Sequence, residues 1–344
     1  MYRGGIQVHG GAPGSLVGTV LAFLLPSHAS LWLDLVGLAG SLVLLAVSGD
    51  QFVVALARIS DSLSIRPTVA AALVGGFGTS IAELIVAGVA VSKSPTLASG
   101  SLVGSIAANV CLALAIAVLI TPIKVDSATV RREAPLSVAS VALFAILALG
   151  GITVAKSVVM LVELVLAVAA LLFFARVHGK EEDVLGSEMV EFASRNPRRS
   201  PVETVRALAM LAVMLAGAEL MVTATVGLAR HLGISDGFAG VTLVGVGTSA
   251  PLIAASIQAA RRGEHDLVVG NVLGGNLFIA VGGGAIVGLL AHGGAVHVSG
   301  IALALMAGVV LVSWLAMARG SRMVRAEAVA LLVVYGATLP FVNH

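Results

Sequence analysis

The chain has 344 residues, of which 58% are hydrophobic and 11% are charged, and its formal net charge is +2. In a soluble globular domain about 25% of residues are charged, so this composition excludes that class and indicates an integral membrane protein. A net charge this small implies no nucleic-acid partner.

Residues 1–30 form an N-terminal segment of their own. A short apolar run over residues 16–26 is followed by Ser27, His28 and Ala29. This pattern fits either a secretory signal with a small-residue cleavage site or a short interfacial helix. Arg3 alone makes a poor positively charged region for a signal, so we favour the interfacial helix.

Ten apolar stretches follow, each long enough to cross about 30 Å of hydrocarbon as a helix. Barrel strands need only about 9–11 residues, and every backbone amide in lipid must be hydrogen-bonded within the protein. The sequence therefore predicts an all-α polytopic membrane protein with ten transmembrane helices. The expected spans are residues 31–57, 68–92, 97–120, 134–150, 154–175, 202–228, 237–260, 267–291, 298–317 and 323–340.

A polar stretch divides these spans into two groups of five. We expect a first five-helix repeat over residues 31–175, a cytoplasmic linker over 176–201 and a second five-helix repeat over 202–344. Sixteen of the twenty Lys and Arg residues lie in loops after odd-numbered spans. By the positive-inside rule these loops are cytoplasmic, which predicts a plasma-membrane protein with both termini outside and the central loop inside.

The two halves share identities at a fixed spacing. Gly78-Thr79-Ser80 matches Gly247-Thr248-Ser249 at an offset of 169 residues, and Asp50 matches Glu219 at the same offset. Beyond Glu83 the offset becomes 170, where two glycine pairs coincide. Because each half holds an odd number of spans, the second half enters the membrane from the opposite side, and the repeats are inverted.

The Gly-Thr-Ser segments predict an ion site near the middle of the membrane. Glycines beside Thr and Ser in mid-span break or kink a helix, which frees carbonyl and hydroxyl oxygens to replace the water around a cation. For the glycine pairs Gly100 and Gly104, and Gly270 and Gly274, close helix packing is the favoured role. Glu83 lies on the face of Thr79 and Ser80, and a mid-membrane carboxylate is a functional candidate by default.

Three other acids lie in or near the spans. Asp50 is predicted toward the cytoplasmic end of the first span and Glu219 toward the outer end of the sixth, where they could line opposing access paths, although interfacial solvation explains either equally well. For Glu163 in the fifth span we favour a helix-packing or lipid-interface role over transport.

The stretch Gly-Thr-Ser-x-x-Glu followed by Gly-x-x-x-Gly-Ser-x-x-x-Asn resembles the α-repeats of the calcium/cation antiporter superfamily, which includes sodium/calcium and proton/calcium exchangers. The resemblance implies a monomeric antiporter in which spans 2, 3, 7 and 8 surround the ions while spans 1 and 6 slide across them. The positions that match the ion-coordinating residues of the superfamily are Thr79, Ser80, Glu83, Ser105, Asn109, Thr248 and Ser249.

The second repeat departs from the superfamily pattern. Leu252 replaces its glutamate, and Gly275 and Ile279 stand at two further ligand positions. Ca²⁺ takes six to eight oxygens, whereas this site offers one carboxylate.

We therefore predict a secondary-active cation antiporter centred on Glu83 with altered ion selectivity or stoichiometry. Na⁺, Ca²⁺ or H⁺ would be the transported cations, and no cofactor is expected. The alternatives are a proton-coupled cation exchanger and a transport-inactive membrane sensor or scaffold. An enzyme is disfavoured because the sequence lacks nucleophile–base spacing and a phosphate loop.

Overall fold

The computed structural model describes residues 31–62, 67–124, 127–178, 200–291, 294–320 and 322–342. The N-terminal segment 1–30 and most of the linker 176–201 lie outside these residues. Each of the ten predicted spans is helical over most of its described residues, so the predicted all-α fold is confirmed. Within the described residues, seven helical segments are long and apolar enough to cross a membrane, and Ala134–Ala148 forms a shorter apolar helix.

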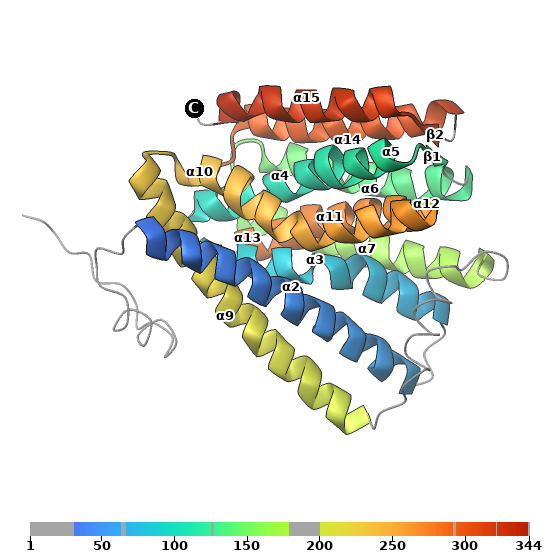
Figure 1. Ribbon diagram of the computed structural model, residues 1–344, viewed down its shortest axis with the longest axis horizontal. Helices are drawn as coiled ribbons and strands as arrows, with labels where there is room; N and C mark the ends of the chain where they lie inside the picture. The colour runs from blue at the N-terminus through green and yellow to red at the C-terminus, as the bar shows by residue number, and fades with distance from the viewer. Residues whose placement is uncertain are drawn as a thin grey trace, which may run out of the picture.

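The first half contains five helical spans (Figure 1). Three of them are continuous α-helices and one is α-helical with a proline inside it, whereas the third span passes through one π-helical segment, η1. The elements are α2 (Leu31–Ser62), α3 (Pro67–Lys93), α4 (Pro95–Ala108), η1 (Asn109–Leu114), α5 (Ala115–Ile120), α6 (Ser127–Ala148) and α7 (Val154–His178).

The second half repeats this arrangement, with π-helical segments in two of its spans. Its elements are α9 (Ser200–Leu232), α10 (Asp236–Ala239), η2 (Gly240–Val244), α11 (Gly245–Arg262), α12 (His265–Leu277), η3 (Phe278–Gly283), α13 (Gly284–Leu290), α14 (Gly300–Gly320) and α15 (Arg325–Val342). The short strands β1 (Ile123–Lys124) and β2 (Arg322–Met323) pair in antiparallel fashion and tie the two halves together.

The helix interruptions differ from those expected at the Gly-Thr-Ser segments. α3 runs without a break through the first segment, and in the second half the π-helix η2 ends just before Gly247. A π-helix adds one residue to a turn and is often found at functional sites. The irregular backbone therefore lies beside the second Gly-Thr-Ser segment and in η1 and η3, rather than within the first segment.

Glycines bring α4 against the η2–α11 span at backbone distance. A Cβ atom added to Gly104 would lie 2.6 Å from the Cα of Val241, and one added to Gly245 would lie 2.6 Å from the carbonyl carbon of Gly104. Real Cβ atoms do not approach backbone atoms this closely. The close packing expected of Gly104 is therefore present, and it holds together two of the helices that carry the Ser and Thr residues singled out above.

We expect Gly104→Ala to destabilise the protein by at least about 2 kcal/mol, because the added methyl meets backbone that cannot rotate away. Gly308→Ala in α14 is the matched control, since a Cβ there has nothing within 4 Å and alanine is the better helix former. Thermal unfolding of the purified variants in detergent measures both effects. Equal melting temperatures for the two variants would contradict the packing argument.

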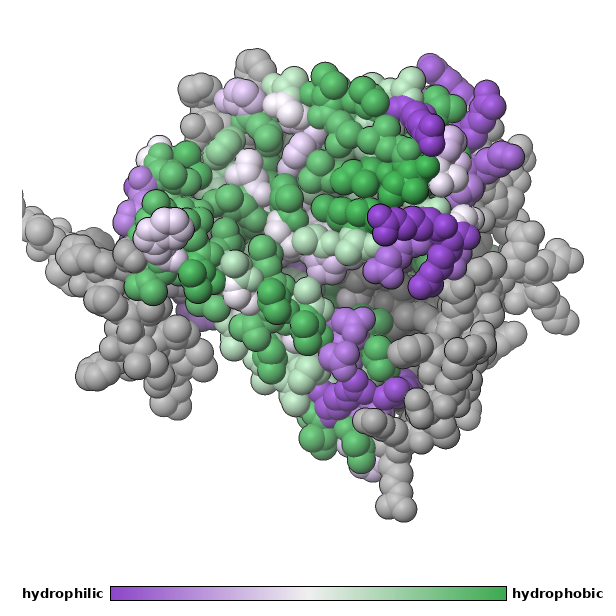
Figure 2. Space-filling view, viewed as in Figure 1, coloured by the Kyte–Doolittle hydropathy of each residue, from purple (hydrophilic) through white to green (hydrophobic). Residues whose placement is uncertain are grey.

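The long helices α2 and α9 lie side by side at one edge of the helix bundle (Figure 1). A Cβ added to Gly37 of α2 would lie 3.3 Å from the Cβ of Ala224 in α9, so small residues let the two helices approach closely. The outward faces are apolar, and Trp32 is 73% exposed. In Figure 2 hydrophobic residues cover the middle of the visible face and hydrophilic residues gather toward one end, as a bilayer requires.

Candidate functional site

Glu83 is the central residue of the candidate site. It lies in the middle of α3 with a relative exposure of 4%, and its Oε2 atom is buried without a hydrogen-bond partner among the described residues. Ser80 lies one turn earlier on the same face and donates to the carbonyl of Gly275 in α12 at 3.3 Å. The side chain of Thr79 lies outside the described side chains.

Ser105, Thr248 and Ser249 join the two repeats at the crossing of α4 and α11. The hydroxyl oxygens of Ser105 and Thr248 are 3.1 Å apart, and Ser249 donates to the carbonyl of Ser105 at 3.5 Å. In the repeat alignment Ser249 corresponds to Ser80 and Ser105 corresponds to Gly275. The bonds Ser80 to Gly275 and Ser249 to Ser105 are therefore equivalents under the inverted repeat.

Two asparagines extend this polar layer. Asn109, the first residue of η1, donates its amide to the side-chain oxygen of Asn276 in α12 at 3.0 Å. Both side chains are fully buried, and the Oδ1 of Asn109 has no hydrogen-bond partner among the described residues. A Cβ added to Gly275 would lie 3.2 Å from Ser80 and 3.8 Å from Asn109, so the asparagine pair adjoins the Glu83 face of α3.

The structure thus gathers buried oxygen atoms from four helices into one layer. Of the seven residues predicted from the sequence, six have described side chains, and all six are buried: Ser80, Glu83, Ser105, Asn109, Thr248 and Ser249. Main-chain carbonyls of Ser105, Gly245 and Gly275 also belong to the layer, and the sequence did not indicate which residues would supply them. Asn276, which is not among those seven residues, adds a further neutral oxygen to the layer.

The matching positions of the second repeat are apolar. Leu252 and Ile279 are both buried, and Gly275 has no side chain. Among the residues that the structure describes, no group of three or more His, Cys, Asp or Glu side chains could hold a metal ion. Hydroxyl, amide and carbonyl dipoles with one carboxylate can replace the water around a small cation, but they supply a single negative charge.

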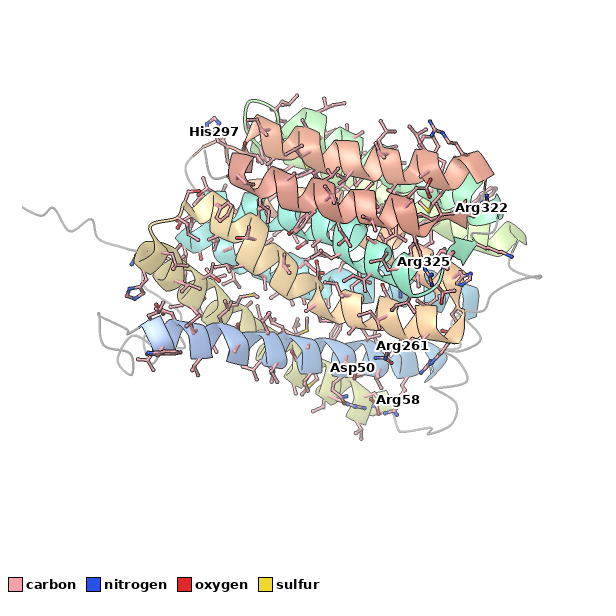
Figure 3. All side chains as sticks on the ribbon, turned by 45° about the horizontal axis from the view of Figure 1, so that its top comes forward. Asp50, Arg58, Arg261, His297, Arg322 and Arg325 are labelled. Carbon is pink, nitrogen blue, oxygen red and sulfur yellow. The ribbon has the colours of Figure 1, made fainter. Side chains whose placement is uncertain are left out.

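The two acids expected on access paths lie outside this layer. Asp50 is exposed on α2 and accepts a hydrogen bond from Gln51, and Figure 3 places it toward the same end as Arg58 and Arg261. Glu219 of α9 forms an ion pair with Lys93 at the end of α3, and Lys93 also donates to Thr223 at 2.5 Å. Glu219 therefore links the α2–α9 pair to the bundle, while its access-path role stays a prediction.

Two comparisons identify relatives by sequence. The family described as sodium/calcium exchanger protein matches residues 33–175 and 203–342. CaxA of Alkalimonas amylolytica, a candidate antiporter by its name, is 33% identical over 241 residues, which cover 69% of this chain and 74% of CaxA. The inner membrane protein YrbG of Escherichia coli K12 is 31% identical over 243 residues, with 69% of this chain and 74% of YrbG covered.

A solved structure has a similar fold. The sodium-calcium exchanger NCX_Mj, in crystals soaked with Na⁺ and Sr²⁺, superimposes with a TM-score of 0.64 and 26% sequence identity, covering 90% of this chain and 99% of NCX_Mj. The likeness extends over both halves of the chain, which confirms the predicted arrangement of two inverted five-helix repeats.

Proposed function

Because this chain belongs to the sodium/calcium exchanger family of membrane antiporters, we propose that it exchanges cations by alternating access at a midplane site centred on Glu83. Thr79, Ser80, Ser105, Asn109, Thr248 and Ser249 would supply neutral oxygens to the same ion. No covalent chemistry enters this cycle, since the family consists of secondary transporters.

The observation that carries this proposal is the unpaired buried oxygen of Glu83. An ionised carboxylate without a partner is very costly in an apolar interior, so the group requires either a cation or a proton. A residue that must hold one of the two and can exchange one for the other has the property that an antiporter needs.

The pair α2 and α9 is suited to moving as one body. Ion pairs between Arg58 and Glu203 and between His231 and Asp34 join the two helices at both ends. Toward the bundle, the pair is held to α3 by the ion pair of Lys93 with Glu219. If α9 slides past α3, this last pair must break while the pairs between α2 and α9 persist.

We further propose that ion selectivity has diverged from Na⁺/Ca²⁺ exchange. One carboxylate balances one monovalent cation or one proton, and a Ca²⁺ ion at this site would keep an uncompensated charge. The same observation favours a second candidate function, a proton-coupled exchanger in which Glu83 carries the proton.

The distribution of charge supports the proposed orientation. Arg58, Arg261, Arg322 and Arg325 lie toward one end of the helices, away from His297 (Figure 3). In a plasma membrane this end would face the cytoplasm, with the central loop on the same side and both termini outside. We propose that a single chain is the functional unit, because the layer around Glu83 draws on both repeats of one chain.

Ion flux into proteoliposomes tests the proposed selectivity. We expect ²²Na⁺ uptake to respond to an imposed Na⁺ or pH gradient and Na⁺-driven ⁴⁵Ca²⁺ uptake to be weak. Robust Na⁺-driven ⁴⁵Ca²⁺ uptake would contradict the altered selectivity. A chain that binds cations without any flux would instead fit the sensor or scaffold alternative.

Leu252→Glu restores the acid that the second repeat lacks. We expect it to raise ⁴⁵Ca²⁺ uptake relative to ²²Na⁺ uptake by about tenfold, a difference of about 1.4 kcal/mol, because a second carboxylate balances a divalent ion. Leu252→Gln has a similar size without the charge and is the control. If both variants shift selectivity equally, charge is not the determinant.

A further inference from the structure

A second carboxyl group lies within the bundle, away from the layer around Glu83. Glu163 is in the membrane-spanning part of α7, and its Oε1 lies 2.6 Å from the hydroxyl oxygen of Ser140 in α6. Its Oε2 is buried and has no hydrogen-bond partner among the described residues. This contact joins two helices that bear none of the predicted ion ligands.

Glu163 and Glu83 each precede a leucine that lies against η3. Leu164 follows Glu163 and Leu84 follows Glu83, and both leucines meet Gly282 of η3. A Cβ added to Gly282 would lie 3.6 Å from Leu164 and 3.7 Å from Leu84. Each acid is therefore next in sequence to a leucine packed at Gly282, and Glu163 is hydrogen-bonded to Ser140, outside the layer around Glu83.

The hydroxyl of Ser140 has one hydrogen and two acceptors in reach. It lies 3.0 Å from the carbonyl oxygen of Leu136, the usual acceptor of a helical serine, and 2.6 Å from Glu163. A protonated Glu163 satisfies both contacts, because its own O–H donates to Ser140 while Ser140 donates to Leu136. An ionised Glu163 would have one hydrogen bond on Oε1 and none on Oε2, which is costly at this depth.

No cation among the described side chains offsets a charge on Glu163. α7 packs against α3, α6, η3 and α13, and neither η3 nor α13 contains a titratable residue. The charged or titratable residues of the remaining elements whose side chains are described are Glu83 and Lys93 of α3 and Lys156 of α7. Those whose side chains are not described are Arg131, Arg132 and Glu133 at the start of α6 and Arg176 and His178 at the end of α7. Lys93 pairs with Glu219, and Lys156 is bonded to the carbonyls of Leu149 and Gly151.

We propose that Glu163 and Ser140 form a proton-binding site separate from the cation site. Glu163 holds a proton at neutral pH and donates it in a hydrogen bond to Ser140. When the proton leaves at alkaline pH, the uncompensated carboxylate disrupts the contact between α6 and α7, and the packing of both helices against η3 weakens. The ligand is a proton rather than Na⁺, because one hydroxyl and one carboxyl offer too few oxygens for a metal cation.

Infrared spectroscopy of the reconstituted full-length protein tests this site directly. The C=O stretching band of a protonated carboxyl group is expected at neutral pH in the wild type, and Glu163→Gln is expected to remove the part of this band that Glu83 does not contribute. Glu83→Gln should keep the Glu163 band, which separates this proposal from the role of Glu83. A neutral-pH band that is missing in the wild type or unchanged in Glu163→Gln would overturn the proposal.

Two further measurements keep the test independent of folding. Glutamine is neutral and can donate to Ser140, so Glu163→Gln should retain the wild-type melting temperature at neutral pH and lose less transport than the wild type at alkaline pH. Identical pH profiles would overturn the link to transport. Ser140→Ala leaves the acid but removes its acceptor, so it should shift the carboxyl band, and an unshifted band would contradict the hydrogen bond.

Discussion

Glu83→Gln is expected to lower cation flux by at least about a hundredfold while leaving the protein folded. The substitution keeps the size of the side chain and removes the one negative charge of the layer, and a hundredfold loss corresponds to about 2.7 kcal/mol. Because a neutral amide is cheaper to bury than a carboxylate, the melting temperature should not fall. Flux of ²²Na⁺ and ⁴⁵Ca²⁺ in proteoliposomes measures the loss.

The rise in melting temperature on adding a cation shows whether a variant has lost cation binding or only the movement of its helices. A cation that binds the folded state raises the melting temperature in proportion to its occupancy, and this rise should vanish in Glu83→Gln. Glu327→Gln at the start of α15 is the matched control, because its side-chain oxygen can still accept from the amide of Val324. Unchanged flux in Glu83→Gln would remove Glu83 from the transport site.

The sequence was sufficient for the overall fold because hydropathy and repeat spacing are properties of many residues at once. Apolar stretches of membrane length gave all ten spans, and the matching Gly-Thr-Ser segments indicated inverted halves. The side chains of the candidate site could also be singled out, since hydroxyls and a carboxylate in mid-membrane are rare, while their role as ion ligands stays a prediction. Six of the seven predicted residues have described side chains, and these lie together in one buried layer.

Backbone carbonyls were predicted near the Gly-Thr-Ser segments, but the individual residues that supply them could not be. The carbonyls of Gly245 and Gly275 accept hydrogen bonds in the layer, but every residue has a carbonyl, so composition carries no signal for them. The π-helix η2 was missed for a related reason. It lies where Gly240 meets the backbone of α4, with an added Cβ only 3.0 Å from the amide nitrogen of Ser101, and such packing depends on the partner helix.

A pair of buried acids was also overlooked, although the repeat offset relates them. Asp34 and Glu203 are 169 residues apart, each in the first turn of its long helix. Each is buried against the end of the other long helix, where Asp34 faces His231 at 3.4 Å and Glu203 faces Arg58 at 2.9 Å. Extending the search at this offset beyond the glycine motifs would have found them.

The ion pairs at the two ends of the α2–α9 pair should contribute unequally to stability. Glu203→Ala should lower the free energy of unfolding more than Asp34→Ala does. The Glu203 side chain is 1% exposed and contacts both Arg58 and Arg206 at 2.9 Å and 3.3 Å. Removing one partner of a buried ion pair typically costs 3–5 kcal/mol, because the other charge stays buried and unpaired. The His231 side chain is 42% exposed, so Asp34→Ala should cost much less.

Thermal unfolding of the two variants, together with the wild type, measures this difference. We expect both variants to lose transport, and only Glu203→Ala to show a large fall in melting temperature. This result would fit two helices that move as one body and are anchored at the Arg58 end. Equal destabilisation by both variants would contradict the asymmetry.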